Sequence, residues 1–266
     1  MNQQRFSNQN VIVTGAGEGI GWEVARQFCR EGASALLNDL LPKRAIAAAE
    51  AIAEQTGGCC LPAPGDVADI ELARGLVARA VEEFGALDVC VCNAGLTSWG
   101  DFFSYSPADF ERVVNVNLRG TYFLAQAAAR QFRAQGGGGR IVLMSSVTGH
   151  QAVPYLSAYG MTKAALEMLA RNLVLELSPH GITINCVAPG AVITPRNLSD
   201  DPDYEAAWAA LTPTRQAIHT TDIANAALFL AAPAASQITG QTLVVDGGWS
   251  STSPIPTMDY GRDYAN

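Results

Sequence analysis

The stretch VIVTGAGEGIG, residues 11–21, decides the fold of this chain. It opens with an apolar, β-branched run that predicts a buried strand, and a helical pattern begins near residue 20. Glycine permits a tight turn between them and lets a phosphate group approach the N–H groups at the start of the helix. The stretch therefore predicts a strand, a phosphate-binding turn and a helix.

The glycine spacing of this turn departs from the common dinucleotide pattern G-x-G-x-x-G, which requires glycine where Ile20 stands. The turn has G-x-x-x-G-x-G instead. A glycine-rich turn can be purely structural, but its place after the first strand favours a dinucleotide site. The residues that we expect at the diphosphate are Gly15, Glu18, Gly19, Ile20 and Gly21.

Apolar runs alternate with longer helical patterns along the chain, which indicates βαβ units. Strands are expected at 11–14, 35–38, 59–63, 88–92, 140–145, 183–188 and 242–246. Helices are expected near 20–31, 42–55, 69–84, 107–134, 155–178 and 220–232. We predict a single doubly wound, Rossmann-type α/β domain over residues 1–250, in which about seven parallel strands carry helices on both faces.

Two segments break this alternation. Residues 190–217, rich in Pro, Asp and Ala, follow the carboxyl end of a strand, where open α/β sheets bind ligands. We interpret them as an irregular substrate lid. The tail 251–266 has little apolar periodicity and is either disordered or packed on a neighbouring subunit.

Composition limits the partners. The net charge is -8, which argues against nucleic acid or an anionic membrane surface as a partner. Neither a leader pattern nor an apolar run of the roughly 18 residues that a membrane span needs occurs, so a cytoplasmic location is expected. The six cysteines lack C-x-x-C spacing, and the three histidines share no ligand spacing. No metal site is expected.

Asp39 follows the second predicted strand, where a carboxylate accepts hydrogen bonds from the adenosine ribose hydroxyls. An acidic residue there repels a 2′-phosphate, and Glu18 adds negative charge nearby. NAD is therefore expected as cofactor rather than NADP. Lys43 and Arg44 would favour NADP, but we interpret both as solvated charges at the start of a helix.

Tyr159 and Lys163 are spaced to share one face of a predicted helix. That spacing often arises by chance. It gains meaning because a neighbouring ammonium favours a phenolate, so that Tyr159 can act as an acid or base near neutral pH. Ser146 is expected at the end of the fifth strand, where its hydroxyl can hold a substrate oxygen beside Tyr159.

With these motifs the sequence resembles the short-chain dehydrogenase/reductase family from about residue 6 to residue 250. Beside the glycine turn, Ser146 and Tyr159-x-x-x-Lys163, the matching pieces in order are Asp66-Val67, Asn93-Ala94-Gly95, Asn115-Val116-Asn117 and Pro189-Gly190. Each motif alone is weak evidence. Their joint occurrence in this order carries the resemblance.

The resemblance implies roles for matching residues. Tyr159 is the acid/base, Lys163 lowers its pKa and holds the nicotinamide ribose, Ser146 orients the substrate oxygen, and Asn117 fixes a relay water. The implied cofactor contacts are Asp39 and Leu40 at the adenosine ribose, Asp66 and Val67 at the adenine, Asn93, Ala94 and Gly95 beside them, and Pro189, Gly190, Val192 and Thr194 at the nicotinamide, with Tyr159 and Lys163.

One position departs from the family pattern, because Cys92 stands where a second asparagine is common, and this puts the rigidity of the loop in doubt. The candidate substrate contacts, besides Ser146 and Tyr159, are Trp99, His150, Gln151 and Asn197. For His150 a bland surface position is an equal alternative, and for Trp99 a place on the pocket rim.

We therefore expect an NAD(H)-dependent oxidoreductase that acts on a secondary alcohol or carbonyl compound, such as a sugar, a polyol or a small hydroxy compound. The alternatives are a 3-oxoacyl-thioester (acyl-carrier-protein) reductase and a non-catalytic dinucleotide sensor. The predicted helices 107–134 and 155–178 are apolar over more than one face, which indicates an oligomer. By the family resemblance it is a homotetramer.

Overall fold

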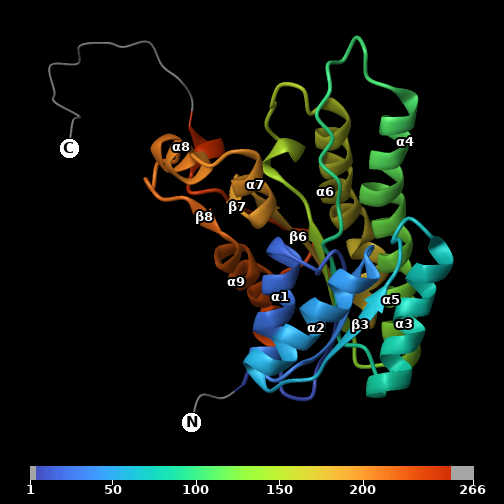
Figure 1. Ribbon diagram of the computed structural model, residues 1–266. Helices are drawn as coiled ribbons and strands as arrows, with labels where there is room; N and C mark the ends of the chain where they lie inside the picture. Colours follow the sequence, from blue (N-terminus) through green and yellow to red (C-terminus); the bar gives the residue numbers. More distant parts are fainter. Residues whose placement is uncertain (1–3, 253–266) are drawn as a thin grey trace, which may run out of the picture.

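A seven-stranded parallel sheet forms the centre of the protein in the computed structural model, which describes residues 4–252 (Figure 1). Its strand order is β3-β2-β1-β4-β5-β6-β9. The strands are β1 (Asn10–Val13), β2 (Ser34–Asp39), β3 (Cys60–Pro64), β4 (Val89–Cys92), β5 (Gly139–Met144), β6 (Ile182–Pro189) and β9 (Thr242–Val245). The predicted doubly wound sheet is confirmed. Its order reverses beside β1, so a crevice opens between the carboxyl ends of β1 and β4.

Helices cover both faces of this sheet (Figure 1). One face carries α1 (Gly19–Arg30), α2 (Pro42–Thr56) and α9 (Thr220–Ala231), and the other carries α3 (Ile70–Phe84), α4 (Pro107–Val114), α5 (Thr121–Gln135) and α6 (Ser157–Leu177). Two apolar clusters separate the helices from the sheet. Val11 and Val13 of β1 belong to the first cluster and Ile12 to the second, as the alternation of side chains along a strand requires.

The prediction of one continuous α-helix over 107–134 is wrong for the middle of that range. A π-helical segment, η1 (Asn115–Gly120), joins α4 to α5. It turns the Asn117 side chain inward, where Oδ1 accepts a hydrogen bond from Leu96 N (2.7 Å) and Nδ2 donates to Leu96 O (2.9 Å). A Cβ on Gly120 would lie 2.5 Å from the Val67 carbonyl oxygen, so glycine is required there. The wide turn thus attaches the helix to two loops of the cofactor edge.

The expected irregular segment 190–217 contains short regular elements, so that part of the interpretation is corrected. Strand β7 (Val192–Ile193) pairs in parallel with β8 (Ile218–His219), and between them lie α7 (Pro195–Asp200) and α8 (Tyr204–Leu211). Neither helix contains a fully buried residue. Apolar periodicity is therefore too weak to predict them from sequence.

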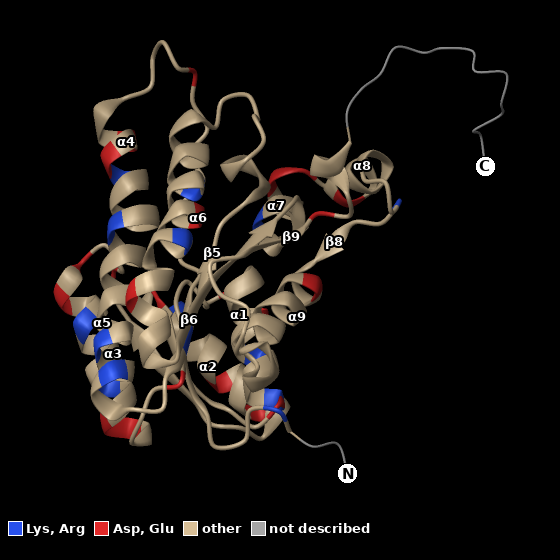
Figure 2. Ribbon diagram, turned by 180° about the vertical axis from the view of Figure 1, so that it is seen from behind, with Lys and Arg blue, Asp and Glu red and all other residues tan. Residues whose placement is uncertain are grey.

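The surface carries both signs of charge along α3 and α4 (Figure 2). Among residues 4–252 no helix is long and apolar enough to cross a membrane. Over the same residues, no three His, Cys, Asp or Glu side chains gather closely enough to hold a metal ion. All six cysteines are free thiols, and all but Cys59 are buried. From residue 253 onward, the predicted tail lies outside the described residues.

Candidate active site

A cavity of about 620 Å³ follows the carboxyl edge of the sheet from the glycine turn to the segment 190–217. All of the residues expected at the cofactor line it, and so do Ser146, Trp99 and Asn197. Asn117 does not line it and acts from behind, through Leu96. The motifs that are scattered along the sequence therefore meet around one cavity.

The turn after β1 fits closely against the loop after β4. Gly15 has φ +60°, and a Cβ there would lie 2.7 Å from Ala94 Cα. A Cβ on Gly21 would lie 2.4 Å from the Gly15 carbonyl oxygen. Only glycine permits this packing, which leaves the first N–H groups of α1 free to bind a diphosphate. The turn therefore fits a dinucleotide.

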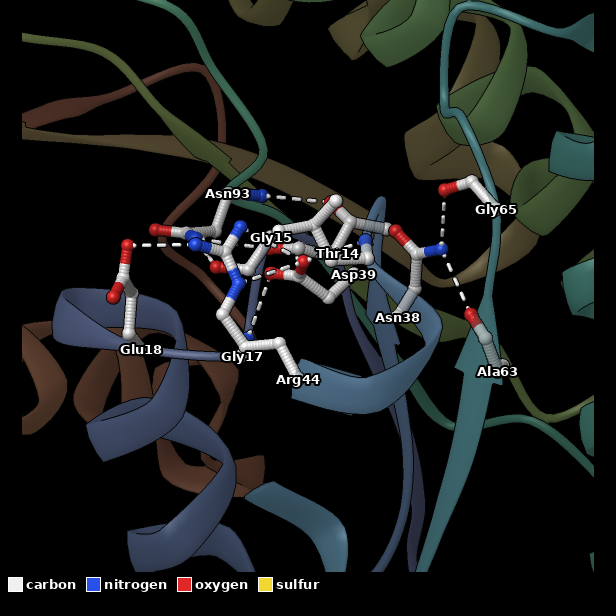
Figure 3. A network of polar contacts seen from close by, with 11 residues as sticks. Thr14, Gly15, Gly17, Glu18, Asn38, Asp39, Arg44, Ala63, Gly65 and Asn93 are labelled. Atoms are coloured by element: carbon white, nitrogen blue, oxygen red, sulfur yellow. Dashed lines mark hydrogen bonds and ion pairs between the residues drawn. The ribbon is translucent and has the colours of Figure 1, made fainter. Parts of the chain in front are cut away.

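Asn93 and Thr14 hold the loop after β4, whose rigidity was in doubt because Cys92 replaces an asparagine (Figure 3). Thr14 Oγ1 accepts hydrogen bonds from Asn93 N (3.1 Å) and Ala94 N (3.2 Å), and Asn93 Nδ2 donates to Thr14 O (2.9 Å) and Gly15 O (3.0 Å). The Cys92 thiol is buried beside that of Cys90, with 3.8 Å between the sulfur atoms. Position 92 is thus a packing position, and the loop is held without a second asparagine.

Asp39 is the centre of a polar network at the adenosine end of the cavity (Figure 3). Its Oδ2 accepts from Gly17 N (3.1 Å), and its Oδ1 accepts from Leu41 N (3.0 Å) and from Arg44 Nε (2.9 Å). Arg44 also pairs with Glu18 at 2.8 Å. The interpretation of Arg44 as a solvated charge is therefore wrong, because its guanidinium bridges both acids that were expected to repel a 2′-phosphate.

Lys163 is buried at the catalytic end, 3% exposed. Its Nζ donates to the Met144 carbonyl oxygen at 2.7 Å and lies 5.4 Å from the centroid of the Tyr159 ring. Burial lowers the pKa of Lys163 to about 8, because removal from water disfavours the charged ammonium. The hydrogen bond to Met144 fixes the amine above the end of β5.

The environment of Tyr159 moves its pKa in two directions. Burial has the larger effect and raises the pKa of Tyr159 above its usual value, and hydrogen bonds with Ser146 and Thr97 offset part of this rise. Two hydroxyl groups thus counteract the effect of burial, and the lowering by Lys163 stays a prediction. Sequence reasoning missed Thr97, and its position in the loop after Asn93-Ala94-Gly95 is the only signal that points to it.

Three aromatic residues line the far end of the cavity: Tyr204, Trp208 and Trp249. The sequence analysis did not predict them as site residues. The Trp208 and Trp249 rings meet edge to face with centroids 5.1 Å apart. Asn197 Nδ2 donates to the Tyr204 hydroxyl at 3.2 Å. Burial, with a smaller contribution from Asp201, raises the pKa of Tyr204 to about 12, so its phenol stays protonated near neutral pH.

His150 and Gln151 do not line this cavity, and the expected place of His150 in the substrate pocket is corrected. The turn η2 (Val147–Gly149) carries His150 toward α6, where its Nδ1 lies 3.3 Å from Glu167 Oε1. Gln151 lines an adjoining cavity of about 450 Å³, which shares Thr148, Val153 and Leu156 with the large one, so its predicted substrate contact stays a prediction. Of the substrate candidates, the structure brings Ser146, Tyr159, Trp99 and Asn197 together.

Known proteins share this architecture. A family model described as enoyl-(acyl carrier protein) reductase matches residues 15–250. The chain is 38% identical to glucose 1-dehydrogenase of Gluconobacter oxydans, over 92% of this chain and 93% of that protein. It is 36% identical to L-rhamnose 1-dehydrogenase (NAD(P)(+)) of Azotobacter vinelandii, over 91% and 96%. A short-chain type dehydrogenase/reductase from Mycobacterium marinum superposes with a TM-score of 0.87 at 33% identity, over 93% of this chain and 98% of that one.

The doubly wound sheet, the glycine turn and the pair of half-buried Tyr159 and buried Lys163 define a dinucleotide-binding oxidoreductase. More narrowly, the chain belongs to the short-chain dehydrogenase/reductase family.

The Tyr159 hydroxyl is the predicted proton-transferring group of this site. Tyr159→Phe is therefore expected to lower turnover by at least about a hundredfold, the usual contribution of a general acid–base, while NADH affinity changes little. Tyr155→Phe is the matched control, because Tyr155 is exposed and does not line the large cavity. Steady-state rates and NADH fluorescence titration measure both quantities. A Tyr159→Phe variant that turns over at the wild-type rate would contradict the role.

Proposed function

We propose that this protein is an NAD(H)-dependent dehydrogenase that oxidises a secondary hydroxyl group of a sugar or polyol to a carbonyl group. The observation that carries the proposal is the continuity of one cavity, from the glycine turn past Ser146 and Tyr159 to the aromatic wall of Tyr204, Trp208 and Trp249. The similarity to glucose and L-rhamnose dehydrogenases supports the substrate class.

The protein and the cofactor supply different groups for the reaction. A bound nicotinamide supplies the hydride acceptor. In oxidation the Tyr159 phenolate takes the hydroxyl proton of the substrate as the carbinol hydrogen leaves with its electron pair, and in reduction the phenol returns the proton. Ser146 donates a hydrogen bond to the same substrate oxygen. Lys163 holds the cofactor ribose, and because its pKa is about 8 the ammonium is present at neutral pH and is lost as the pH rises above that value.

The aromatic wall suits a ring with one apolar face. A pyranose presents C–H groups on one side and hydroxyls around its rim, so it can pack on an indole while polar groups hold its edge. Trp99 on the opposite loop and the amide of Asn197 are the nearest further contacts. This combination favours a sugar over the long flexible chain of an acyl thioester.

A substrate panel tests the activity. Wild-type protein is incubated with NAD and separately with aldoses, polyols, secondary alcohols and, in the reverse direction with NADH, a 3-oxoacyl thioester. NADH formation with at least one sugar or polyol is expected, and Tyr159→Phe is the blank. Turnover of the thioester alone would establish the alternative reductase. Tight NADH binding without turnover of any compound would favour a dinucleotide sensor.

NAD is the proposed cofactor because Asp39 faces the adenosine end of the cavity and is itself buried. Arg44 is held by this carboxylate, so removal of the carboxylate frees a guanidinium for a 2′-phosphate. Asp39→Ala is expected to reduce the ratio of kcat/KM with NAD to kcat/KM with NADP by about tenfold or more, the value of one charge-assisted hydrogen bond. Glu50→Ala, an exposed acid on the same helix as Arg44, is the control. A wild-type preference for NADP would contradict the assignment.

A homotetramer is the proposed assembly. Met161, Met168 and Leu175 form an exposed apolar stripe on α6, with Phe110 of α4 and Tyr122 of α5 also exposed. Leu175→Glu places a charge on this stripe and is expected to reduce the molar mass measured by light scattering. Ile46→Glu, at an exposed apolar site on the other side of the sheet, should leave it unchanged. An unaltered mass for Leu175→Glu would rule out this surface.

A cytoplasmic location completes the proposal. It is supported by the six free thiols, which suit a reducing compartment.

A further inference from the structure

Glu167 is a buried carboxylate that the proposed reaction does not use. It lies on α6 one helical turn beyond Lys163 and is 6% exposed. An acidic side chain is rarely buried unless polar partners compensate the loss of water. Its partners therefore indicate what it does.

One partner directly follows β5 in the chain. The Ser145 hydroxyl lies 2.9 Å from Glu167 Oε1 and 3.1 Å from the Lys163 carbonyl oxygen, and its single proton serves both acceptors. The preceding residue, Met144, accepts the hydrogen bond from Lys163 Nζ. Met144, the last residue of β5, and Ser145 after it are thus both attached to α6, immediately before Ser146.

The other partner follows Ser146 in the chain. Ser146 Oγ accepts a hydrogen bond from Thr148 N (3.2 Å), which starts the turn η2. This turn packs directly on α6, because a Cβ on Gly149 would lie 2.9 Å from Glu167 Oε1 and 3.0 Å from Ala164 N. His150 then closes the turn with its Nδ1 3.3 Å from the same Glu167 oxygen.

We propose that Glu167 is a positioning residue: by binding Ser145 before Ser146 and His150 after it, its carboxylate fixes the Ser146 hydroxyl relative to Tyr159 and Lys163, which lie on its own helix. This inference rests on the proposed function only because it takes Ser146 and Tyr159 as active-site residues. It gives His150 a role behind the active site instead of in contact with substrate.

The charged and titratable groups around Glu167 come from three directions. Lys163 precedes it on α6, and His150 approaches from η2. Cys186 of β6 is close enough that the Glu167 charge, added to burial, raises the pKa of that thiol to about 12. His150 in turn helps to lower the pKa of Asp246, at the end of β9. The thiol of Cys186 is thus neutral near pH 7.

The consequence for catalysis passes through Tyr159. The hydrogen bond with Ser146 lowers the pKa of Tyr159. A displaced Ser146 weakens that bond, so the pKa of Tyr159 rises and the phenolate needed for alcohol oxidation forms only at higher pH. A residue that merely stabilised the fold would not move this pH dependence.

Glu167→Leu tests the inference, with Glu176→Leu on the same helix as the control, because Glu176 is exposed. Glu167→Leu is expected to reduce kcat between about tenfold and a hundredfold, as for the loss of one or two hydrogen bonds to a charged group. The rise of the oxidation rate with pH should shift to higher pH, while NADH affinity stays within about twofold. Glu167→Gln keeps an acceptor for Ser145 and is expected to restore most of kcat and the wild-type pH profile.

A second variant covers the case in which Glu167→Leu does not fold. Ser145→Ala removes only the hydroxyl and is expected to reduce kcat and shift the pH profile in the same direction. Ultraviolet absorbance measures the pKa of Tyr159 without any substrate. The phenolate signal is the difference between each protein and the same protein with Tyr159→Phe, and it should show the same shift to higher pH. It therefore separates this inference from the proposed sugar oxidation. An unshifted Tyr159 titration in Ser145→Ala, or in folded Glu167→Leu, overturns the positioning role.

Discussion

The close contact between the turn after β1 and the loop after β4 is the constraint on which the rest of the site depends. Gly15 touches Ala94 so closely that any larger residue would push the two apart. Four hydrogen bonds between Thr14, Gly15, Asn93 and Ala94 hold the contact in register. Because the sheet order reverses between these strands, the same contact forms the floor of the crevice. These contacts fix the two loops at the cofactor edge relative to each other.

The catalytic end is built differently, from polar groups withdrawn from water. Burial of Lys163 is unfavourable for the ammonium, as its lowered pKa shows, and the bond to Met144 O offsets only part of that cost. Glu167 and Ser145 add a second buried polar contact beside it. Such groups lower stability unless each is paired, so their pairing fixes one arrangement of β5 against α6. The surroundings of Tyr159 are therefore set by the packing of α6 against the end of β5 and not by the Tyr-x-x-x-Lys spacing alone.

The parts of the fold that could be predicted from sequence are those governed by local rules. The alternation of strands and helices follows from periodicity, and the glycine turn from backbone geometry. Asn117 was found through its motif, but the π-turn that aims it inward depends on Leu96 and Val67, far away in the chain. From the sequence, Arg44 has the pattern of an ordinary charged residue at the start of a helix. Its ion pairs with Asp39 and Glu18 depend on tertiary packing, which the local sequence does not show. His150 was misplaced for the same reason, because no periodicity signals its partner.

The substrate end shows how a weakly packed segment gains a fixed position. Neither α7 nor α8 contains a fully buried residue, so hydrophobic packing alone does not hold them on the sheet. Trp249, in contrast, follows a turn in which Asp246 accepts hydrogen bonds from Gly248 N (2.8 Å) and Ser250 N (2.6 Å), and the two glycines take positive φ. The indole is thereby fixed to the end of β9, and Trp208 packs on its edge. The short helices can therefore differ in position without displacing Ser146, which follows β5, or Tyr159 and Lys163 on α6.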